Sequence, residues 1–372
     1  MGARRRGRLL LTTTIVLVAG AALPAIAATA GWTTQPVPSP SSVTQLDGVS
    51  CGAAGDCLAI GTSVPFGSIA LHLHGGRWTS VALAKPAKRW ELAAVSCASP
   101  SACMAVGLIS TAAKGHPDYP LAERWNGRRW SVTSAPRVRG ELDSVSCVAD
   151  DDCVAVGQRT SGSTSLIADW DGQGWSLAEP APPAGSRPLA AVSCTAAQTC
   201  MAVGQLGVEA REAPFAERLD SSGWHIEQVP VPSSIATAAG LLASFEAVSC
   251  AGPSLCTAVG NYVTSARYPQ PLAGVWNGSG WRVEAIAHRH PELNLQGVAC
   301  LTASSCQAVG YTLHGTLAIG WNGTAWTLDA TPPSHSTKQF PTELSAVSAV
   351  PGGGFIAVGY AHTVKALVEH HP

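Results

Sequence analysis

The amino-acid sequence predicts an all-β protein, a seven-bladed β-propeller with four antiparallel strands in each blade. Three observations carry this prediction. The phrase LxxVSC, five residues, CxAVG occurs in seven copies, counting one without cysteines, at a period near 50 residues, which indicates a repeat architecture. Each copy contains turn signals and short apolar runs for four strands. The segment GWTTQPVPSP (31–40) matches a fourth-strand phrase without a third strand before it, so we expect it to complete the last blade.

The four strands can be assigned in order within one copy. In LAAVSCASPSACMAVG (92–107), LAAVSC is the predicted first strand and CMAVG is a wholly apolar predicted second strand. A variable segment follows, and PLAERW (120–125) is the predicted third strand. Asn126-Gly127 then favours a tight hairpin turn in which both central residues have positive φ. The fourth strand begins near Trp130 and ends at a proline.

The twelve cysteines are predicted to form one disulfide inside each of six copies. The pairs are Cys51/Cys57, Cys97/Cys103, Cys147/Cys153, Cys194/Cys200, Cys250/Cys256 and Cys300/Cys306. Zinc sites use shorter spacings with a second ligand pair nearby, and redox centres use C-x-x-C. The seventh copy, LSAVSAVPGGGFIAVG (344–359), has Ala349 and Phe355 at the two positions. Both cysteines are absent together, as expected of bonded partners.

The N-terminus predicts export. Residues 1–30 contain four arginines, an apolar stretch and small residues suited to cleavage after Ala27 or Ala30, which is typical of a secretory signal peptide. An uncleaved anchor is the alternative. The mature propeller would span 31–372, with 19 basic against 24 acidic side chains, a net charge of −5. This balance argues against a nucleic-acid partner, and after cleavage we expect no membrane association.

Paired tryptophans flank the turns between the third and fourth strands, and we expect them to pack blade against blade. The pairs are Trp125/Trp130, Trp170/Trp175, Trp276/Trp281 and Trp321/Trp326. Their W-x-G-x-x-W spacing resembles the Asp-box turn of sialidase-type propellers in turn geometry only, because Trp125, Trp276 and Trp321 occupy the aspartate position. The complete repeat more closely resembles secreted actinobacterial repeat proteins of undefined function. That resemblance implies an extracellular propeller and supplies no catalytic residues.

The variable loops are the predicted binding side. The loops between second and third strands and those between blades share one face of the disc, and their lengths vary widely. Tyrosine and tryptophan suit interfaces because they combine contact area with a polar tip. The candidate binding residues are Trp90, placed in an inter-blade loop, and Tyr119, Tyr262, Tyr268, Tyr311 and Tyr360. The leading hypothesis is a secreted, non-enzymatic propeller that recognises a glycan or a protein.

An extracellular glycosidase or lyase, with a site at the central channel mouth, is the alternative. The sequence contains no catalytic motif, so no catalytic residue is assigned and no cofactor is expected. His72/His74 and His288/His290 are H-x-H pairs without a placed third ligand, and no metal site is assigned.

Overall fold

A computed structural model describes residues 31–38, 44–63, 67–87, 89–110, 118–160, 164–178, 186–208, 211–238, 240–264, 268–286, 292–333, 342–361 and 365–372. The predicted signal peptide lies outside these residues. Within them, no helix has the length and apolar character needed to cross a bilayer.

The chain forms strands throughout, and each copy of the phrase supplies the first two strands of a group. The first three groups are β2–β5 (Thr44–Ala53, Asp56–Ser63, Ser68–His74, Arg77–Val81), β6–β9 (Trp90–Ser99, Ala102–Ile109, Tyr119–Trp125, Trp130–Val132) and β10–β13 (Gly140–Ala149, Asp152–Arg159, Ser165–Trp170, Trp175–Ala178). The next three are β14–β17 (Ser186–Ala196, Thr199–Val208, Arg211–Asp220, Gly223–Glu227), β18–β21 (Leu242–Gly252, Leu255–Val263, Gln270–Trp276, Trp281–Ala285) and β22–β25 (Leu293–Thr302, Ser305–Thr312, Gly315–Trp321, Trp326–Leu328). The last group is β26–β28 (Glu343–Ala349, Phe355–Ala361, Lys365–His371), and β1 (Thr33–Thr34) and helix α1 (Ser233–Ala236) complete the elements.

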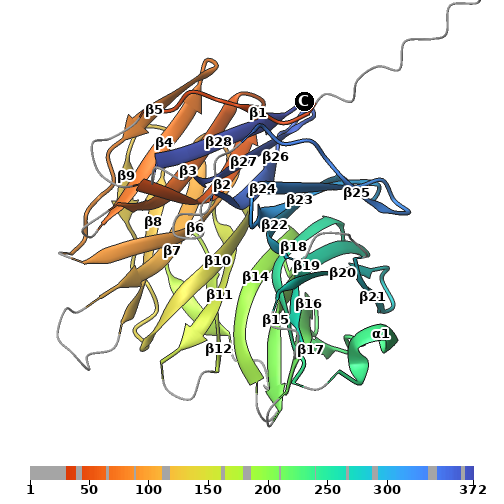
Figure 1. Cartoon of the computed structure of the whole chain (residues 1–372). Coiled ribbons are helices and arrows are strands. Elements are labelled where there is room, and N and C mark those ends of the chain that lie inside the picture. Colours follow the sequence, from red (N-terminus) through yellow and green to blue (C-terminus); the bar gives the residue numbers. More distant parts are fainter. Residues whose placement is uncertain are drawn as a thin grey trace, which may run out of the picture.

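Within each group, neighbouring strands pair antiparallel in chain order. The last group takes its fourth strand from the N-terminus, because β1 pairs antiparallel with β28 through Thr33–His370 and Thr34–Glu369. One parallel bridge between Glu212 and Leu242 joins the sheets of β14–β17 and β18–β21. Figure 1 shows the sheets arranged as spokes, with the first strand of each group toward the centre. The first strands contact one another in succession, and β26 also contacts β2.

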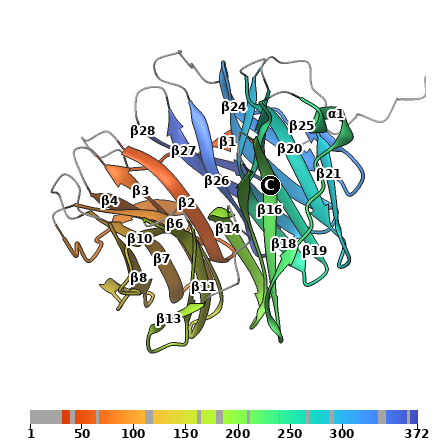
Figure 2. The ribbon, with the colours of Figure 1, turned by 90° about the horizontal axis from the view of Figure 1, so that it is seen from below.

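The apolar core is divided among the seams between neighbouring groups. The buried apolar residues of the described chain form seven clusters, and each joins two adjacent groups. One cluster joins the last group to the first, with Ile356 and Val368 packed with Leu46 and Trp78. In both views α1 lies at the outer edge beside β21 (Figures 1 and 2), where Ile235 packs in the same cluster as Trp281. The core therefore consists of separate apolar clusters, each packed between two neighbouring sheets.

Six disulfides link β2 to β3 and the equivalent strands of the next five groups, as the spacing predicts. The bonded pairs are Cys51–Cys57, Cys97–Cys103, Cys147–Cys153, Cys194–Cys200, Cys250–Cys256 and Cys300–Cys306. Their Cα atoms lie 3.9–4.0 Å apart. Such closeness is typical of opposed residues that do not exchange ladder hydrogen bonds. The backbone N–H of the first cysteine is therefore free to bond outside its own sheet.

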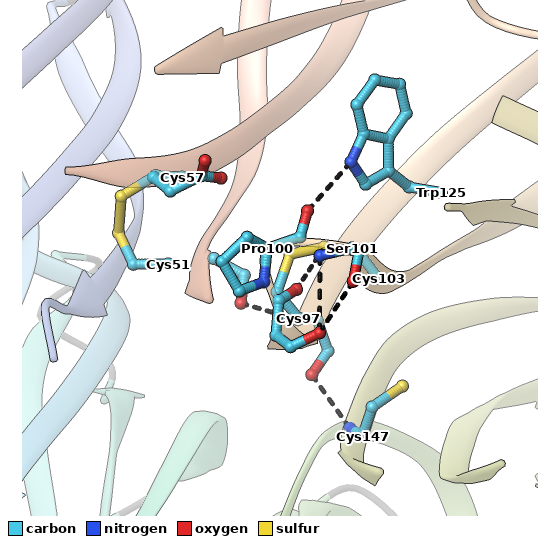
Figure 3. The surroundings of a disulfide bond; sticks show 12 residues. Cys51, Cys57, Cys97, Pro100, Ser101, Cys103, Trp125 and Cys147 are labelled. Carbon is cyan, nitrogen blue, oxygen red and sulfur yellow. Dashed lines mark hydrogen bonds between the residues drawn. A yellow bond between two sulfur atoms is a disulfide. The ribbon is translucent and has the colours of Figure 1, made fainter. Parts of the chain in front are cut away.

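That N–H donates to the serine of the preceding group's VSC phrase. Cys147 N–H donates to Ser96 Oγ at 2.9 Å, as Figure 3 shows. The same bond joins Cys97 to Ser50, Cys194 to Ser146, Cys250 to Ser193, Cys300 to Ser249 and Cys51 to Ser348, at 2.9–3.2 Å. We call these contacts the inter-group serine bonds. The seam between the last two groups has alanine, Ala299, at the serine position.

The tryptophan pairs face each other across the third and fourth strands, with ring centroids 5.3–6.0 Å apart. Trp125 Nε1 donates to the carbonyl oxygen of Pro100 in the disulfide loop of its own group (Figure 3). The turn between the rings differs from the prediction. Gly127 has φ of +85°, whereas Asn126 has no positive φ. Instead, Asn126 Oδ1 accepts the backbone N–H groups of Arg128 and Arg129, which closes a four-residue loop.

Candidate functional site

A β-bulge in the first strand of every group sends one extra residue out of the ladder. In β2, Leu46 pairs with Gly61 and Gly48 pairs with Ile60, so Asp47 between them has no partner. The equivalent bulge residues in the later groups are Ala93, Asp143, Ala190, Glu246, Gln296 and Ser345. The bulge therefore presents one side chain per group near the molecular centre.

The glycine of CxAVG makes room for this bulge. A Cβ at Gly61 would lie 1.9 Å from the carbonyl oxygen of Gln45, far inside any van der Waals contact. In every group, a Cβ added at the corresponding glycine would lie no more than 2.4 Å from the carbonyl oxygen of the residue before the buried Leu or Phe. The bulge in the first strand consequently requires a glycine opposite it in the second strand.

The bulge residues and their neighbours line two cavities. A cavity of about 420 Å³ is bordered by Asp47, Glu91, Glu141 and Asp143. A second, of about 340 Å³, is bordered by Asp143, Glu246 and Gln296. The two share Asp143, and none of the described residues lining either one is lysine, arginine or histidine. We call Asp47, Glu91, Glu141, Asp143, Glu246 and Glu343 together the acidic mouth, because each is a bulge residue or directly precedes the buried Leu of its strand.

Burial changes the acid strength of this group. It raises the pKa of Asp47 to about 7, with the charge of Glu91 acting in the same direction against hydrogen bonds from Gln45 and Thr62. Burial also raises the pKa of Asp143 to about 7, aided by the charge of Glu141. Partly dehydrated carboxylates held close together bind cations more strongly than exposed ones.

Two of the predicted tyrosines border this region. Tyr360 pairs with Glu343 across β26 and β27, and its hydroxyl hydrogen-bonds the Glu343 carboxyl group. Burial, with the charge of Glu343, raises the pKa of Tyr360 to about 12. Tyr311 pairs with Asn294, and its pKa is raised by burial and by the charge of Glu343. Both rings are half-buried and carry protonated hydroxyls at neutral pH.

The other predicted residues lie elsewhere. Placing Trp90 in an inter-blade loop is wrong, because it opens β6 and is only 4% exposed, packed with Leu83 and Leu58 at a seam. Tyr119 begins β8 and Tyr268 precedes β20, at 39% and 53% exposure. Tyr262 is half-buried in β19, against the core. The six residues therefore do not form one patch, and a binding role for the tyrosines stays a prediction.

The cysteines named with the site residues belong to the core and not to a ligand-binding surface. Cys57, Cys153 and Cys306, the second members of their pairs, are 1%, 3% and 2% exposed. Each packs in an apolar cluster at a seam between neighbouring groups. No cysteine of the described chain is free. These second cysteines are therefore core residues, and we assign the disulfides a role in stability.

Sequence reasoning missed the acidic mouth, although a signal was present. Leu46 and Val49 are three positions apart, and both are buried. A regular strand would turn them to opposite faces, since side chains alternate with a period of two. An L-x-x-V spacing with both residues in the core therefore indicates a bulge, and Asp47 stands inside it.

The sequence matches no family model and no curated protein. Solved structures are similar in fold. YCF48 from Cyanidioschyzon merolae has a TM-score of 0.59 at 12% identity, covering 92% of this chain and 99% of that chain. YCF48 bound to D1 peptide has a TM-score of 0.56 at 10% identity, covering 92% and 96%. A fungal lectin from Aleuria aurantia, described as a six-bladed β-propeller with a fucose recognition mode, has a TM-score of 0.51 at 10% identity, covering 88% and 91%. At these identities the similarity shows the fold alone, and the chain is an all-β protein with a β-propeller fold.

Proposed function

We propose that the chain is a secreted, seven-bladed propeller, closed by its N-terminal strand, that binds a basic segment of a peptide or protein at the acidic mouth. Closure is supported by the β1–β28 pairing, by the core cluster between the last and first groups, and by the Ser348–Cys51 bond. Secretion is supported by the signal-like N-terminus and by six disulfides, which persist in oxidising compartments.

The observation that carries the binding proposal is the convergence of carboxylates without a basic residue among them. A site with uncompensated negative charge and partly dehydrated walls favours a cationic ligand. In a peptide or protein ligand, the cationic groups would be lysine and arginine side chains.

A protein ligand suits the mouth better than a neutral glycan. Sugars are bound by aromatic faces and by mixed hydrogen-bond donors and acceptors, whereas ionised carboxylates only accept. The neighbour bound to a D1 peptide and the fucose lectin each bind a ligand of one of these kinds, so propellers accommodate both. For this chain, the charge of the mouth supports the proposal of a basic peptide.

A glycosidase or lyase is the second candidate, and one observation favours it. Asp143, with its pKa raised to about 7, borders the same cavity as Glu141, and two carboxyl groups at one cavity, one of them with a raised pKa, are a pair that general acid–base chemistry can use. Turnover of a polysaccharide or glycoside library that is lost in Asp143→Asn would establish the enzyme and replace the binding proposal.

The binding test uses the mature chain and three fluorescent hexapeptides, composed of lysine and arginine, of serine and glutamine, or of glutamate. Fluorescence anisotropy should detect binding of the basic peptide only, and this binding should weaken as salt is raised because exposed charges are screened. The triple variant Asp47→Asn, Asp143→Asn, Glu246→Gln should weaken it at least tenfold.

The control is Asp150→Asn combined with Asp151→Asn, two carboxylates at the tip of a disulfide loop. These changes remove charge without touching the mouth, so they should leave affinity within about twofold. Equal loss in both variants would mean that the peptide responds to net charge, and no loss in the triple variant would contradict the proposed site.

A further inference from the structure

We propose that Asp56, His72 and His74 form a binding site for one divalent transition-metal ion of the zinc class. The site lies at the start of β3 and the end of β4, next to the disulfide loop of the first group. It is independent of the acidic mouth, which stands near the opposite end of the first strands. The sequence alone shows an H-x-H pair, and the fold adds the third group.

The three side chains already converge. His72 Nε2 lies 3.0 Å from Asp56 Oδ1, and His74 Nδ1 lies 2.9 Å from Asp56 Oδ2. Taking one ligand atom from each residue, the three atoms lie within 4.8 Å of one another. Two ligands bound to zinc at 2.0–2.1 Å with a tetrahedral angle are separated by about 3.3 Å. Both His–Asp distances are close to this value, but they reach different oxygens of Asp56, so the exposed His74 ring must turn toward Oδ1 before one carboxylate oxygen and both imidazole nitrogens can bind the same ion.

The cluster is arranged to allow that approach. His72 is held in place, with its side chain 15% exposed and its ring 5.6 Å from that of Trp125 in an edge-on contact. His74 has 76% of its side chain exposed and can therefore rotate toward a bound ion. Asp56 is 15% exposed and anchored between them. One fixed imidazole, one fixed carboxylate and one mobile imidazole can close on an ion without moving the backbone.

The donor set selects the ion. Two imidazole nitrogens and one carboxylate oxygen suit Zn²⁺, Ni²⁺ and Cu²⁺, whereas Ca²⁺ and Mg²⁺ prefer oxygen ligands throughout. Three protein ligands leave a fourth position to water, the coordination of an open zinc site. Arg77 lies opposite His74 across β4 and β5, and it is exposed, so its guanidinium can turn to solvent when the ion binds.

A plain hydrogen-bonded His–Asp contact is the competing interpretation, and the chain contains a matched example. His225 Nε2 lies 3.2 Å from Asp220 Oδ1, at 43% and 35% side-chain exposure, without a second histidine. If the cluster of the first group were only such a contact, both places would respond to metal in the same way.

The test is isothermal calorimetry of the untagged mature chain with Zn²⁺, in a buffer that does not bind metals. One ion should bind, Cu²⁺ should compete, and Ca²⁺ should not. His74→Gln, which alters only an exposed side chain, should weaken Zn²⁺ binding at least tenfold and abolish the rise in melting temperature on adding Zn²⁺. Asp56→Asn should weaken binding as well.

The control His225→Gln should leave affinity unchanged. A variant with His288→Gln and His290→Gln removes the other H-x-H pair, which lies outside the described residues, and it should bind as the parent does. Loss of the ion in that variant, or unchanged binding in His74→Gln, would overturn the proposal. Equal affinity for Zn²⁺ and Ca²⁺ would overturn the assignment to the zinc class.

Discussion

Replacing Ser96 by alanine tests whether the inter-group serine bonds hold neighbouring sheets together. Ser96 Oγ accepts the N–H of Cys147 at 2.9 Å in a partly buried seam. This N–H has no bond in its own ladder, because the disulfide-bonded pair stands at a position that does not exchange hydrogen bonds. Alanine leaves the donor without a partner.

The expected loss follows from that unpaired donor. A buried donor left unsatisfied costs about 1–3 kcal/mol, and the partial exposure of this seam favours the lower half of the range. Unfolding entropy of about 2.1 cal/mol/K per residue amounts to roughly 0.7 kcal/mol/K for the predicted mature chain of about 340 residues, 31–372. Each kcal/mol therefore lowers the melting temperature by about 1.4 °C, and Ser96→Ala should lower it by about 1.5–3 °C.

Scanning calorimetry of the oxidised protein measures this shift, with exposed Ser80→Ala as the matched control. The reverse change provides a second test, since Ala299 occupies the serine position at the one seam without this bond. Ala299→Ser offers an acceptor to the N–H of Ala349 and should raise the melting temperature by about 1–2 °C, for a net hydrogen bond of about 0.5–1.5 kcal/mol. A Ser96→Ala protein that melts with the parent, or an Ala299→Ser protein that melts below it, would refute the reasoning.

Three further predictions concern stability. Replacing Cys97 and Cys103 together by alanine should cost about 2–3 kcal/mol, because a short loop is no longer closed in the unfolded chain; denaturant titration showing no change would contradict this. Trp32→Ala should cost about 3–5 kcal/mol, since this ring is 4% exposed, and limited proteolysis should then cut first in β26–β28; cuts distributed evenly would argue against N-terminal closure. Folding raises the pKa of Asp47 and Asp143 from 3.8 to about 7, so their stabilising effect is full below pH 4 and is lost as pH rises through 7. The melting temperature should accordingly fall between about pH 4 and pH 7 and level off above, and Asp47→Asn with Asp143→Asn should flatten this fall; parallel curves would contradict it.

The regular features of the repeat could be predicted from sequence because they are local. Cysteine spacing, tryptophan pairs and apolar second strands each follow from a few neighbouring residues, and the structure confirms all three. Trp90 was misplaced because lysine, proline and arginine around it suggest a loop, whereas its ring is drawn into an apolar seam formed by Leu58 and Leu83 of the preceding group. Leu58 lies more than 30 residues before Trp90 in the sequence, so a local pattern could not reveal this contact.

The candidate sites depended on contacts between separate segments. Asp56 joins His72 and His74 only after β3 and β4 pair, and the acidic mouth exists only where several first strands meet. Its members also differ from copy to copy, so a search for repeated residues passes over them. The serine of VSC repeats faithfully, but its acceptor role becomes visible only with the next sheet beside it.

The bulge has a consequence for how such a surface can diversify. Asp47, Asp143 and Glu246 belong to none of the apolar clusters, while the leucine or phenylalanine beside each one and the glycine opposite secure the strand. A substitution at a bulge position therefore alters the chemistry near the axis with little effect on the scaffold. Every group offers one such position, filled here by residues as unlike as Asp47, Ala190 and Gln296. The binding chemistry near the axis can therefore change one group at a time while the strand framework stays the same.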